Sequence, residues 1–548
     1  MRILRRTMAG LLLLAVAAAA PAGTDGDATL RARVQELVEM MVTGDAASRD
    51  AASAELVTLG RAAVPHVARF AHLLRDRAGR DVVASALAKI GVEDSIALVM
   101  SYPANWPDKG RQDVMDLLAA LRALRDPKLA TVVELAPSVA AVAARVPPDA
   151  EIAIADRLPS SLAWGDFAVR KGKTSIQVDV DGSGARFETV DADRPRCLRV
   201  GPRKRPILVY ARLGGWYAAS GSLLAGKLRA EDVELWDADL DGTFNGPRDR
   251  LRVGDGVFQP IPANGLVQTA DGLATMTIRA TAAGATASFV PEPLPKDVGE
   301  WTVRALDVMN TWRRGVGLAP VFVNLARSAM CAKHVDYWRL NGFTGHDEIA
   351  GRPGYTAEGA TAGKKSSVWD NSEPARLVRV ISATVLHRAT CLGPSDEGLG
   401  IASGSGVCLW GGELDVSEND APVLVPGAGQ EEAPITCEPE KPPPDRDMNF
   451  YAVPRGYPVA VVWAGTWDDV LSARIELFLV GAGGATDPVD GALFSPEKPY
   501  TSKGHAMETG AASFVATKPL ERRRTYVAQF RAYRKSGPVE LSWSFTTR

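Results

Sequence analysis

The first quarter of the chain carries apolar residues at helical spacing. Between residues 27 and 140 these positions recur with a step of 31 residues, which relates Leu56, Leu87 and Leu118. The same step relates a second apolar series, Leu59, Ile90 and Leu121. A repeat of this length is typical of stacked helical units, each burying its apolar stripe against the next. The pattern therefore predicts an N-terminal domain of α-helical repeats.

The turn inside one unit resembles that of HEAT-type repeats. It reads Gly60-Arg-Ala-Ala-Val-Pro65, and glycine commonly ends one helix where proline begins the next. The resemblance implies HEAT-like helical repeats over residues 27–140. His66 and His72 lie in this region, where we expect them to pack or to face solvent.

Residues 166–292 change from helical spacing to strand-like alternation. Ile176, Val178 and Val180 alternate with polar residues up to Asp181-Gly-Ser-Gly184, a turn sequence between two strands. We predict a central β-rich domain.

The C-terminal residues also read as strands. In residues 451–548, Tyr526, Ala528 and Phe530 share one face of a strand, and the terminal strand around Trp543 resembles the end of an immunoglobulin-like or fibronectin-like β-sandwich. The preceding residues 413–450 include Pro442-Pro443-Pro444 and few apolar side chains, and we predict a semi-rigid linker there.

Residues 300–412 combine helical and strand patterns. Apolar residues at helical spacing predict two helices, one around Leu306 and one around Leu325. Glycine-rich loops follow, and Gly398–Ala402 and Val407–Trp410 predict a pair of strands that turns at Gly404-Ser-Gly406. This module contains most of the chemistry-bearing side chains.

Its motifs resemble those of the CAP superfamily of cysteine-rich secretory, antigen 5 and pathogenesis-related proteins. The matching segments are Asn310-x-x-Arg313, Gly317-Leu-Ala-Pro320, Asn324-Leu325, Gly345-His346, Tyr355-Thr-Ala-Glu358-Gly359, His387-Arg388, Leu392-Gly-Pro394 and Gly398-Leu-Gly400. The resemblance implies an α-β-α sandwich whose cleft is lined by His346, Glu358 and His387. The family's second acid would fall near Ala375 or Arg376, so this chain has one carboxylate fewer. We expect His334 on a helix surface.

Two chemical interpretations of this set stay open. Two neutral imidazoles and one carboxylate could hold Zn²⁺ with an open position, as in a metal-dependent hydrolase of peptides or envelope polymers. The missing acid weakens acid-base catalysis and favours a non-enzymatic binding protein whose cleft takes a lipid, polysaccharide or peptide ligand. A structural surface scaffold is a third alternative. Neither a nucleotide motif nor another organic cofactor motif is evident.

A second candidate cation site lies in the β-rich domain. The run from Asp237 to Asn245 places oxygen side chains at alternate positions, with glycine at the sixth. Its candidate calcium ligands are Asp237, Asp239, Asp241, Thr243 and Asn245. Position 12 of this run is Arg248 and not the glutamate of an EF-hand, so a non-EF calcium loop and an acidic β-turn stay open.

Five cysteines lie beyond the N-terminal segment: Cys197, Cys331, Cys391, Cys408 and Cys437. An odd count leaves at least one unpaired. The last four admit three connectivities, among which we favour Cys391 with Cys408 because they bracket a short glycine-rich stretch.

The N-terminus and the charge balance indicate the compartment and partners. Residues 1–22 combine early arginines, an apolar run from Met8 to Ala20 and the small-residue site Ala20-Pro-Ala22, which predicts a signal peptide and a secreted, extracellular or periplasmic protein. The run is shorter than the roughly 20 residues of a membrane span, so we expect no transmembrane segment. A net charge of -2 gives no field to attract nucleic acid. We expect a ligand of the cell envelope or the extracellular space.

Overall fold

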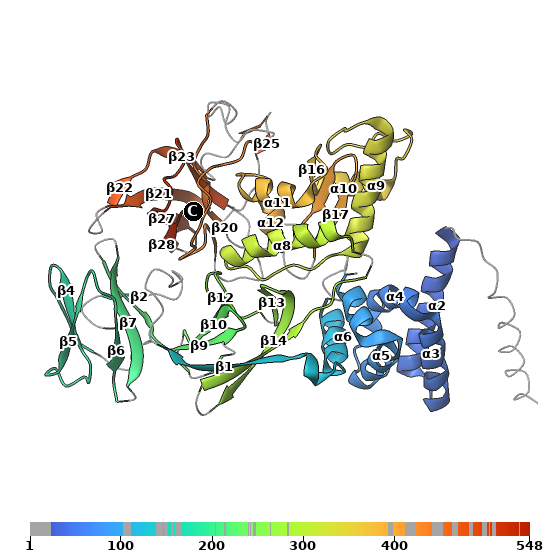
Figure 1. Ribbon diagram of the computed structural model, residues 1–548, viewed down its shortest axis with the longest axis horizontal. Helices are drawn as coiled ribbons and strands as arrows, with labels where there is room; N and C mark the ends of the chain where they lie inside the picture. The colour runs from blue at the N-terminus through green and yellow to red at the C-terminus, as the bar shows by residue number, and fades with distance from the viewer. Residues whose placement is uncertain are drawn as a thin grey trace, which may run out of the picture. The chain divides into compact units, whose positions relative to one another are not determined.

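The computed structural model describes residues 24–548 except 102–110, 139–145, 147–151, 155–157, 159–166, 203, 213–214, 239, 242, 245–247, 263–264, 282–283, 297, 393–397, 412–421, 441–452, 463–469, 482–485, 496–500, 503–504, 507–510 and 536. The chain divides into two units (Figure 1). One comprises Met1–Asp126 with Pro293–Lys296, and the other Pro127–Glu292 with Asp297–Arg548. Each unit is described by itself.

The first unit is helical, as the sequence predicts. Its helices are α2 (Thr24–Thr43), α3 (Ala46–Leu59), α4 (Val64–Arg69), α5 (Arg77–Met100) and α6 (Arg111–Ala123), with short 3-10 turns at Gly60–Ala63 and Ala71–Leu73. The recurring positions Leu56, Leu87 and Leu118 are all buried.

The repeat also appears in the residues that begin and end helices. Asp45 and Asp76 each cap a helix by accepting a backbone N–H, from residues 48 and 79 respectively. Gly60 ends α3 at φ 65, and Gly91 interrupts α5 at φ 143, conformations that favour glycine. Caps and glycines are therefore spaced like the leucines, which supports stacked units; assignment to the HEAT class stays a proposal.

The second unit opens with a 3-10 turn, Pro127–Leu129, followed by a strand within the range predicted to be helical repeats. Residues 131–138 form β1 (Thr131–Ser138), which pairs antiparallel with β15 (Gly284–Pro291) and β9 (Leu223–Leu228). Val133 and Leu135 are buried whereas their neighbours are exposed, so the period here is two. The predicted helical range to residue 140 is thus too long: the last helix ends at residue 123.

The β-rich region contains antiparallel sheets. One has the order β12-β11-β10-β9-β1-β15-β14-β13, a second β2-β8-β7-β6 and a third β3-β4-β5. The strands not yet given are β2 (Ile152–Ala153), β3 (Val169–Lys171), β4 (Ser175–Asp179), β5 (Phe187–Asp191), β6 (Arg196–Val200), β7 (Arg205–Arg212), β8 (Gly215–Ser220), β10 (Glu231–Trp236), β11 (Arg250–Val253), β12 (Gln259–Pro260), β13 (Leu266–Thr269) and β14 (Gly272–Thr281). Ile176 and Val178 on β4 are fully buried, in agreement with the predicted alternation.

The module at residues 300–412 contains a small sheet, in the order β16-β18-β17, and several helices. The elements are α8 (Glu300–Gly315), α9 (Leu325–Asn341), α10 (Ala357–Lys365), β16 (Ser367–Trp369), α11 (Pro374–Ser382), α12 (Ala389–Leu392), β17 (Gly400–Ser403) and β18 (Val407–Trp410). All four residues of β18 are buried, so both faces of the central strand are covered. The predicted strand pair is present, since β17 pairs antiparallel with β18.

Two further sheets form the C-terminal region, in the orders β19-β20-β26-β23 and β22-β21-β27-β28. Their strands are β19 (Val423–Val425), β20 (Val459–Val462), β21 (Val470–Val480), β22 (Thr486–Pro488), β23 (Gly491–Phe494), β26 (Ala511–Ala516), β27 (Thr525–Arg534) and β28 (Gly537–Thr546), with β24 (Thr501–Ser502) and β25 (His505–Ala506) as a separate pair. Residues of both four-stranded sheets share one core. The immunoglobulin-like class stays a proposal.

Part of the predicted linker lies in this core. β19, within the range 413–450, pairs with β20, and Val425 is fully buried. Trp543 donates from its indole nitrogen to the carbonyl of Pro426 at 2.9 Å. The few apolar side chains of this segment are concentrated where they pack. Its overall proline content therefore does not indicate whether it contributes to a core.

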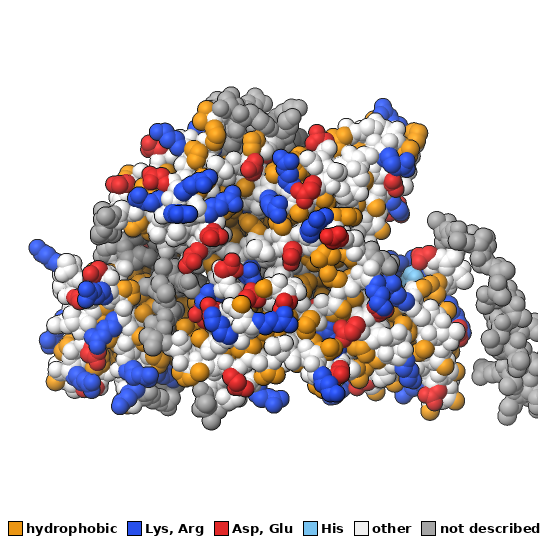
Figure 2. Space-filling model, in the orientation of Figure 1, with side chains coloured by type: hydrophobic (Ala, Val, Ile, Leu, Met, Phe, Trp, Pro, Cys, Tyr) orange, Lys and Arg blue, Asp and Glu red, His pale blue; other side chains and the backbone are white. Residues whose placement is uncertain are grey.

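No helix among the described residues is long and apolar enough to cross a membrane. The predicted signal peptide, residues 1–22, lies outside the described residues. Acidic and basic side chains are interspersed on the face drawn in Figure 2.

We expect acid to destabilise the helical unit through His66. This side chain is buried beside the Asp27 carboxylate, and burial is the main cause that lowers its pKa. The folded state therefore binds the proton less readily than the unfolded chain, whose histidine has a pKa of about 6.5. The stability contributed by neutral His66 is present above that pH and is lost as the pH falls below it.

Amide exchange of α2 and α4 in the full chain measures this effect. Protection factors should fall between about pH 7.5 and 5.5, and His66→Gln should reduce that dependence. The control is His72→Gln, because His72 is exposed. This variant should keep the pH dependence of the wild-type protection factors. Equal pH dependence in wild type and His66→Gln would contradict the assignment.

Candidate functional site

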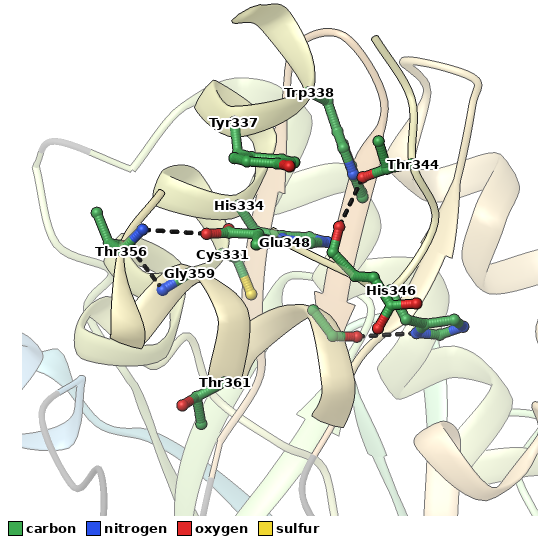
Figure 3. A network of polar contacts seen from close by, with 12 residues as sticks. Cys331, His334, Tyr337, Trp338, Thr344, His346, Glu348, Thr356, Gly359 and Thr361 are labelled. Atoms are coloured by element: carbon green, nitrogen blue, oxygen red, sulfur yellow. Dashed lines mark hydrogen bonds and ion pairs between the residues drawn. The ribbon is translucent and has the colours of Figure 1, made fainter. Parts of the chain in front are cut away.

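The polar centre of the 300–412 module is a buried pair, His334 and Glu348, whose side chains are both fully buried. His334 lies on α9, and its Nδ1 is 2.8 Å from Oε1 of Glu348. Its Nε2 is 3.0 Å from the carbonyl oxygen of Gly345. The indole nitrogen of Trp338 donates to the same carbonyl at 3.1 Å (Figure 3). The pair thus joins α9 to the loop that follows it.

The hydrogen-bond geometry fixes the number of protons in this pair. Both ring nitrogens of His334 face oxygen atoms, and the carbonyl of Gly345 can only accept. One proton therefore lies on Nε2 and another between Nδ1 and Glu348. The pair is either imidazolium with carboxylate or imidazole with carboxylic acid, and in both forms it is neutral as a whole. Such neutrality lets two ionisable groups occupy a core.

Two glycines of α10 make room for the pair. A Cβ at Gly359 would overlap Oε1 of Glu348, and one at Gly363 would overlap the His334 ring. The backbone N–H of Thr356 donates to the second oxygen of Glu348 at 3.1 Å, and its hydroxyl caps α10 by accepting the N–H of Gly359. The Tyr355-Thr-Ala-Glu358-Gly359 segment therefore serves the packing of a buried carboxylate.

The expected surface position of His334 is wrong. Cys331, His334, Val335 and Trp338 occupy the i, i+3, i+4 and i+7 positions of one helix face, and all four are buried. That spacing was visible in the sequence. Because histidine was treated as a polar residue, the apolar face on which it lies was overlooked.

His346 is exposed and lies beside this pair. Its Nδ1 donates to the carbonyl of Gly363 at 2.8 Å, and Figure 3 shows its ring directed away from Glu348. The neutral ring therefore carries its proton on Nδ1 and leaves Nε2 as an acceptor.

Glu358 is also exposed, in the first turn of α10. Its carboxylate lies 3.5 Å from Nζ of Lys333. The pKa of Glu358 is lowered, first by a hydrogen bond from its own backbone N–H and then by the charge of Lys333. A carboxylate at a helix N-terminus is stabilised by the helix dipole. In this position Glu358 has a local structural role.

His387 is held by a carboxylate that the sequence analysis did not identify. Its Nδ1 is 2.8 Å from Oε2 of Glu440, which is almost fully buried, whereas the His387 side chain is 24% exposed. Glu440 also accepts the backbone N–H groups of Val385, Leu386 and His387. Glu440 belongs to the predicted linker, where no sequence signal linked it to His387.

The three predicted residues thus each have a separate partner. Within the part of the chain that the structure describes, no three His, Cys, Asp or Glu side chains lie where they could hold one metal ion. These side chains do not by themselves compose a zinc site, and zinc stays a prediction.

The candidate calcium loop is described only in part. It follows β10, and Oδ1 of Asp237 accepts the N–H of Asp241 at 3.1 Å. Oδ1 of Asp241 accepts the N–H and the hydroxyl of Thr243. Asp239 and Asn245 lie outside the described residues. The described carboxylates organise the turn, and calcium stays a prediction.

The predicted pairing of Cys391 with Cys408 is absent from the structure, in which all five cysteines are free thiols. Cys408 lies in a core cluster with Cys331 of α9, and Cys391 is not part of that cluster. Burial raises the pKa of the Cys391 thiol to about 12. Cys408 lies near Cys331 and not near Cys391 because it is on the face of β18 that packs against α9.

Comparison of the chain with protein-family models, curated proteins and solved structures finds no match.

We expect Gly363→Ala to destabilise the module although alanine favours helices. The added Cβ overlaps the His334 ring, and overpacking of this kind costs about 2 kcal/mol. Thr361→Ala, at an exposed position of the same helix, is the control and should change stability by less than about 0.5 kcal/mol.

The stability of both variants is measured by titrating the full chain with urea and monitoring unfolding through amide exchange of residues 325–365. A Gly363→Ala protein as stable as wild type would show that α10 does not press against the buried pair.

Proposed function

We propose that this chain is an exported binding protein and that its CAP-like module, residues 300–412, binds an apolar ligand of the cell envelope, most simply a lipid. The N-terminal pattern of a signal peptide and the ordered CAP motifs support export and the family. The proposal assigns the helical units and the sandwich to spacing or adhesion.

The observation that carries the binding function is a group of exposed apolar side chains. In the described part of the chain, large hydrophobic residues are rarely exposed, yet four lie between residues 340 and 355. They are Leu340 (50% exposed), Phe343 (43%), Ile349 (50%) and Tyr355 (39%). Clusters of exposed apolar residues are typical of binding surfaces, and these four lie in one short segment of the chain. We refer to these four residues as the apolar loop surface.

The backbone beneath this surface is held rigidly. Asn341 donates to the carbonyl of Pro353 at 2.8 Å, and the N–H of Ile349 donates to the hydroxyl of Tyr337 at 3.0 Å. Phe343 packs on Trp338 with ring centroids 4.8 Å apart. A surface that is already ordered loses little entropy on binding, which favours affinity.

The chemistry of the apolar loop surface selects among the ligands that the sequence leaves open. Burying a fully exposed side chain of this size gains roughly 1.5–3 kcal/mol, and these side chains, which are 39–50% exposed, would each gain about half of that. A polysaccharide offers little apolar area, whereas lipid chains offer a great deal. Arg352, exposed beside Tyr355, supplies a cation for an anionic headgroup. A lipid therefore fits this surface best.

Replacing Phe343 and Ile349 together by serine should weaken binding to vesicles of mixed zwitterionic and anionic phospholipid by more than tenfold, measured by co-sedimentation of the full chain. Leu471→Ser with Tyr533→Ser is the matched control, because both residues are exposed at 61% outside this module. The control should bind like wild type. Absence of wild-type binding, or equal losses in both variants, would favour the scaffold alternative.

One observation favours a hydrolase as the second candidate function. Glu440 holds Nδ1 of His387, so the neutral ring has its basic nitrogen at Nε2, and the ring reaches solvent. A histidine oriented by a buried carboxylate is suited to take a proton from water or from a substrate hydroxyl. This chemistry would act on peptide or envelope-polymer bonds and would use His387 and Glu440.

If the chain is such a hydrolase, Glu440→Gln should lower kcat by about 100-fold or more, because the glutamine no longer stabilises a protonated His387. Glu438→Gln, two residues away, is the control and should leave turnover unchanged. Turnover of peptide and polysaccharide substrates by the full chain is the measurement. Loss of activity with a chelator would instead support the metal-dependent form, and lack of turnover would exclude the hydrolase for those substrates.

A further inference from the structure

Two thiols from distant parts of the sequence meet in the core of the 300–412 module. Cys331 lies on α9 and Cys408 on β18, both are fully buried, and both belong to one cluster of packed side chains. Helix α9 packs against β18, and the Cys408 side chain is close enough to contribute to the raised pKa of the Cys331 thiol. The two thiols therefore share the helix–sheet interface.

The surroundings leave few other roles for this pair. The neighbouring side chains are mostly apolar, among them Val335, Trp338 and Trp410. The Cys331 sulfur also lies 3.9 Å from the hydroxyl of Ser366. Burial raises the pKa of the Cys331 thiol well above its usual value, so it is a poor nucleophile and a poor metal ligand. Among the described residues no third ligand joins the two sulfurs.

We propose that Cys331 and Cys408 are joined by a disulfide in the mature protein. The reaction is a thiol–disulfide exchange: the two thiols lose two protons and two electrons and form one S–S bond, while a disulfide oxidant, such as oxidised glutathione or an oxidoreductase of the export compartment, is reduced to two thiols. The two cysteines lie on elements that pack against each other and belong to the same core cluster, as a disulfide between them requires.

The bond must form before the core closes, because neither sulfur is exposed in the folded chain. Once formed, it fixes α9 to the central strand of the sheet. His334 lies one helical turn after Cys331, so the disulfide anchors the helix whose His334 pairs with Glu348 of the following loop. The same burial shields the bond from reductants.

The other cysteines have no comparable partner. Cys391 and Cys437 lie outside this cluster, and Cys197 lies on β6 in the β-rich region. The pairing leaves three thiols free, in agreement with the odd count. It also replaces the pairing of Cys391 with Cys408 that the sequence spacing favoured.

Alkylation of the denatured full chain tests the proposal. The chain is refolded in a glutathione redox buffer, then denatured and alkylated without reduction, and the cysteine-containing peptides are identified by mass spectrometry. We expect alkylation at Cys197, Cys391 and Cys437 only, and a linked peptide pair that contains Cys331 and Cys408 and separates after reduction. Alkylation of all five cysteines, or a linked pair that includes Cys391, overturns the proposal.

Unfolding temperatures distinguish stabilisation by a disulfide from stabilisation by packing of the two cysteine side chains. Under oxidising conditions Cys331→Ala with Cys408→Ala should lower the melting temperature of the module by roughly 10 °C, and the difference from wild type should shrink when both proteins are reduced. Cys391→Ala, an equally buried cysteine, should show the same loss in both conditions. An equal loss for the double variant in both conditions contradicts the disulfide. These tests do not depend on ligand binding or turnover.

Discussion

An ionisable group can stay in an apolar core only where a partner neutralises it and satisfies its hydrogen bonds. The 300–412 module depends on one such pair. Glu348 and His334 are both fully buried, and together they hold the loop after α9 against α10. Removing either member would leave the other buried without its counter-group, which typically costs about 3–5 kcal/mol. The order of the loop therefore follows from this interaction.

The same constraint explains why glycine and threonine are required at particular positions of α10 and its N-terminus. Gly359 and Gly363 are spaced by one helical turn so that α10 can approach the pair without a Cβ in the way. Thr356 caps that helix and also donates its N–H to Glu348. Motif residues that suggest a catalytic cleft thus have clear packing roles. These packing roles are compatible with the proposal that the apolar loop surface, and not these motif residues, binds the ligand.

Hydrophobic spacing predicted several helices and strands, because each of these elements has a clear pattern within its own residues. Helix spacing identified α8 and α9, alternation identified β4, and two short segments around a Gly-Ser-Gly turn identified the β17–β18 pair. The end of the helical region was missed because Thr131–Ser138 is too short for its period of two to stand out beside a long helical stretch. The 31-residue repeat was readable because the buried leucines recur three times, at residues 56, 87 and 118, and the capping aspartates recur at residues 45 and 76.

The candidate site was less predictable, because its contacts join residues far apart in the sequence. His346 and Glu358 were found as motif residues, but no local pattern gives their partners. His334 could have been recognised from its helix face, since it shares the buried stripe of α9 with Cys331 and Trp338. Glu440 could not have been recognised, because it follows a proline-rich segment and meets His387 only through the fold.

Glu440 also changes how the C-terminal half of the chain is understood. It accepts three backbone N–H groups from residues 385–387, and β19, which lies in the same predicted linker, pairs with β20 of a C-terminal sheet. Val316 and Leu392 of the 300–412 module pack in the same core as both C-terminal sheets. A connector with such contacts cannot act as a free spacer. The 300–412 module and the two C-terminal sheets should therefore fold together, with His387 oriented only when those sheets are present.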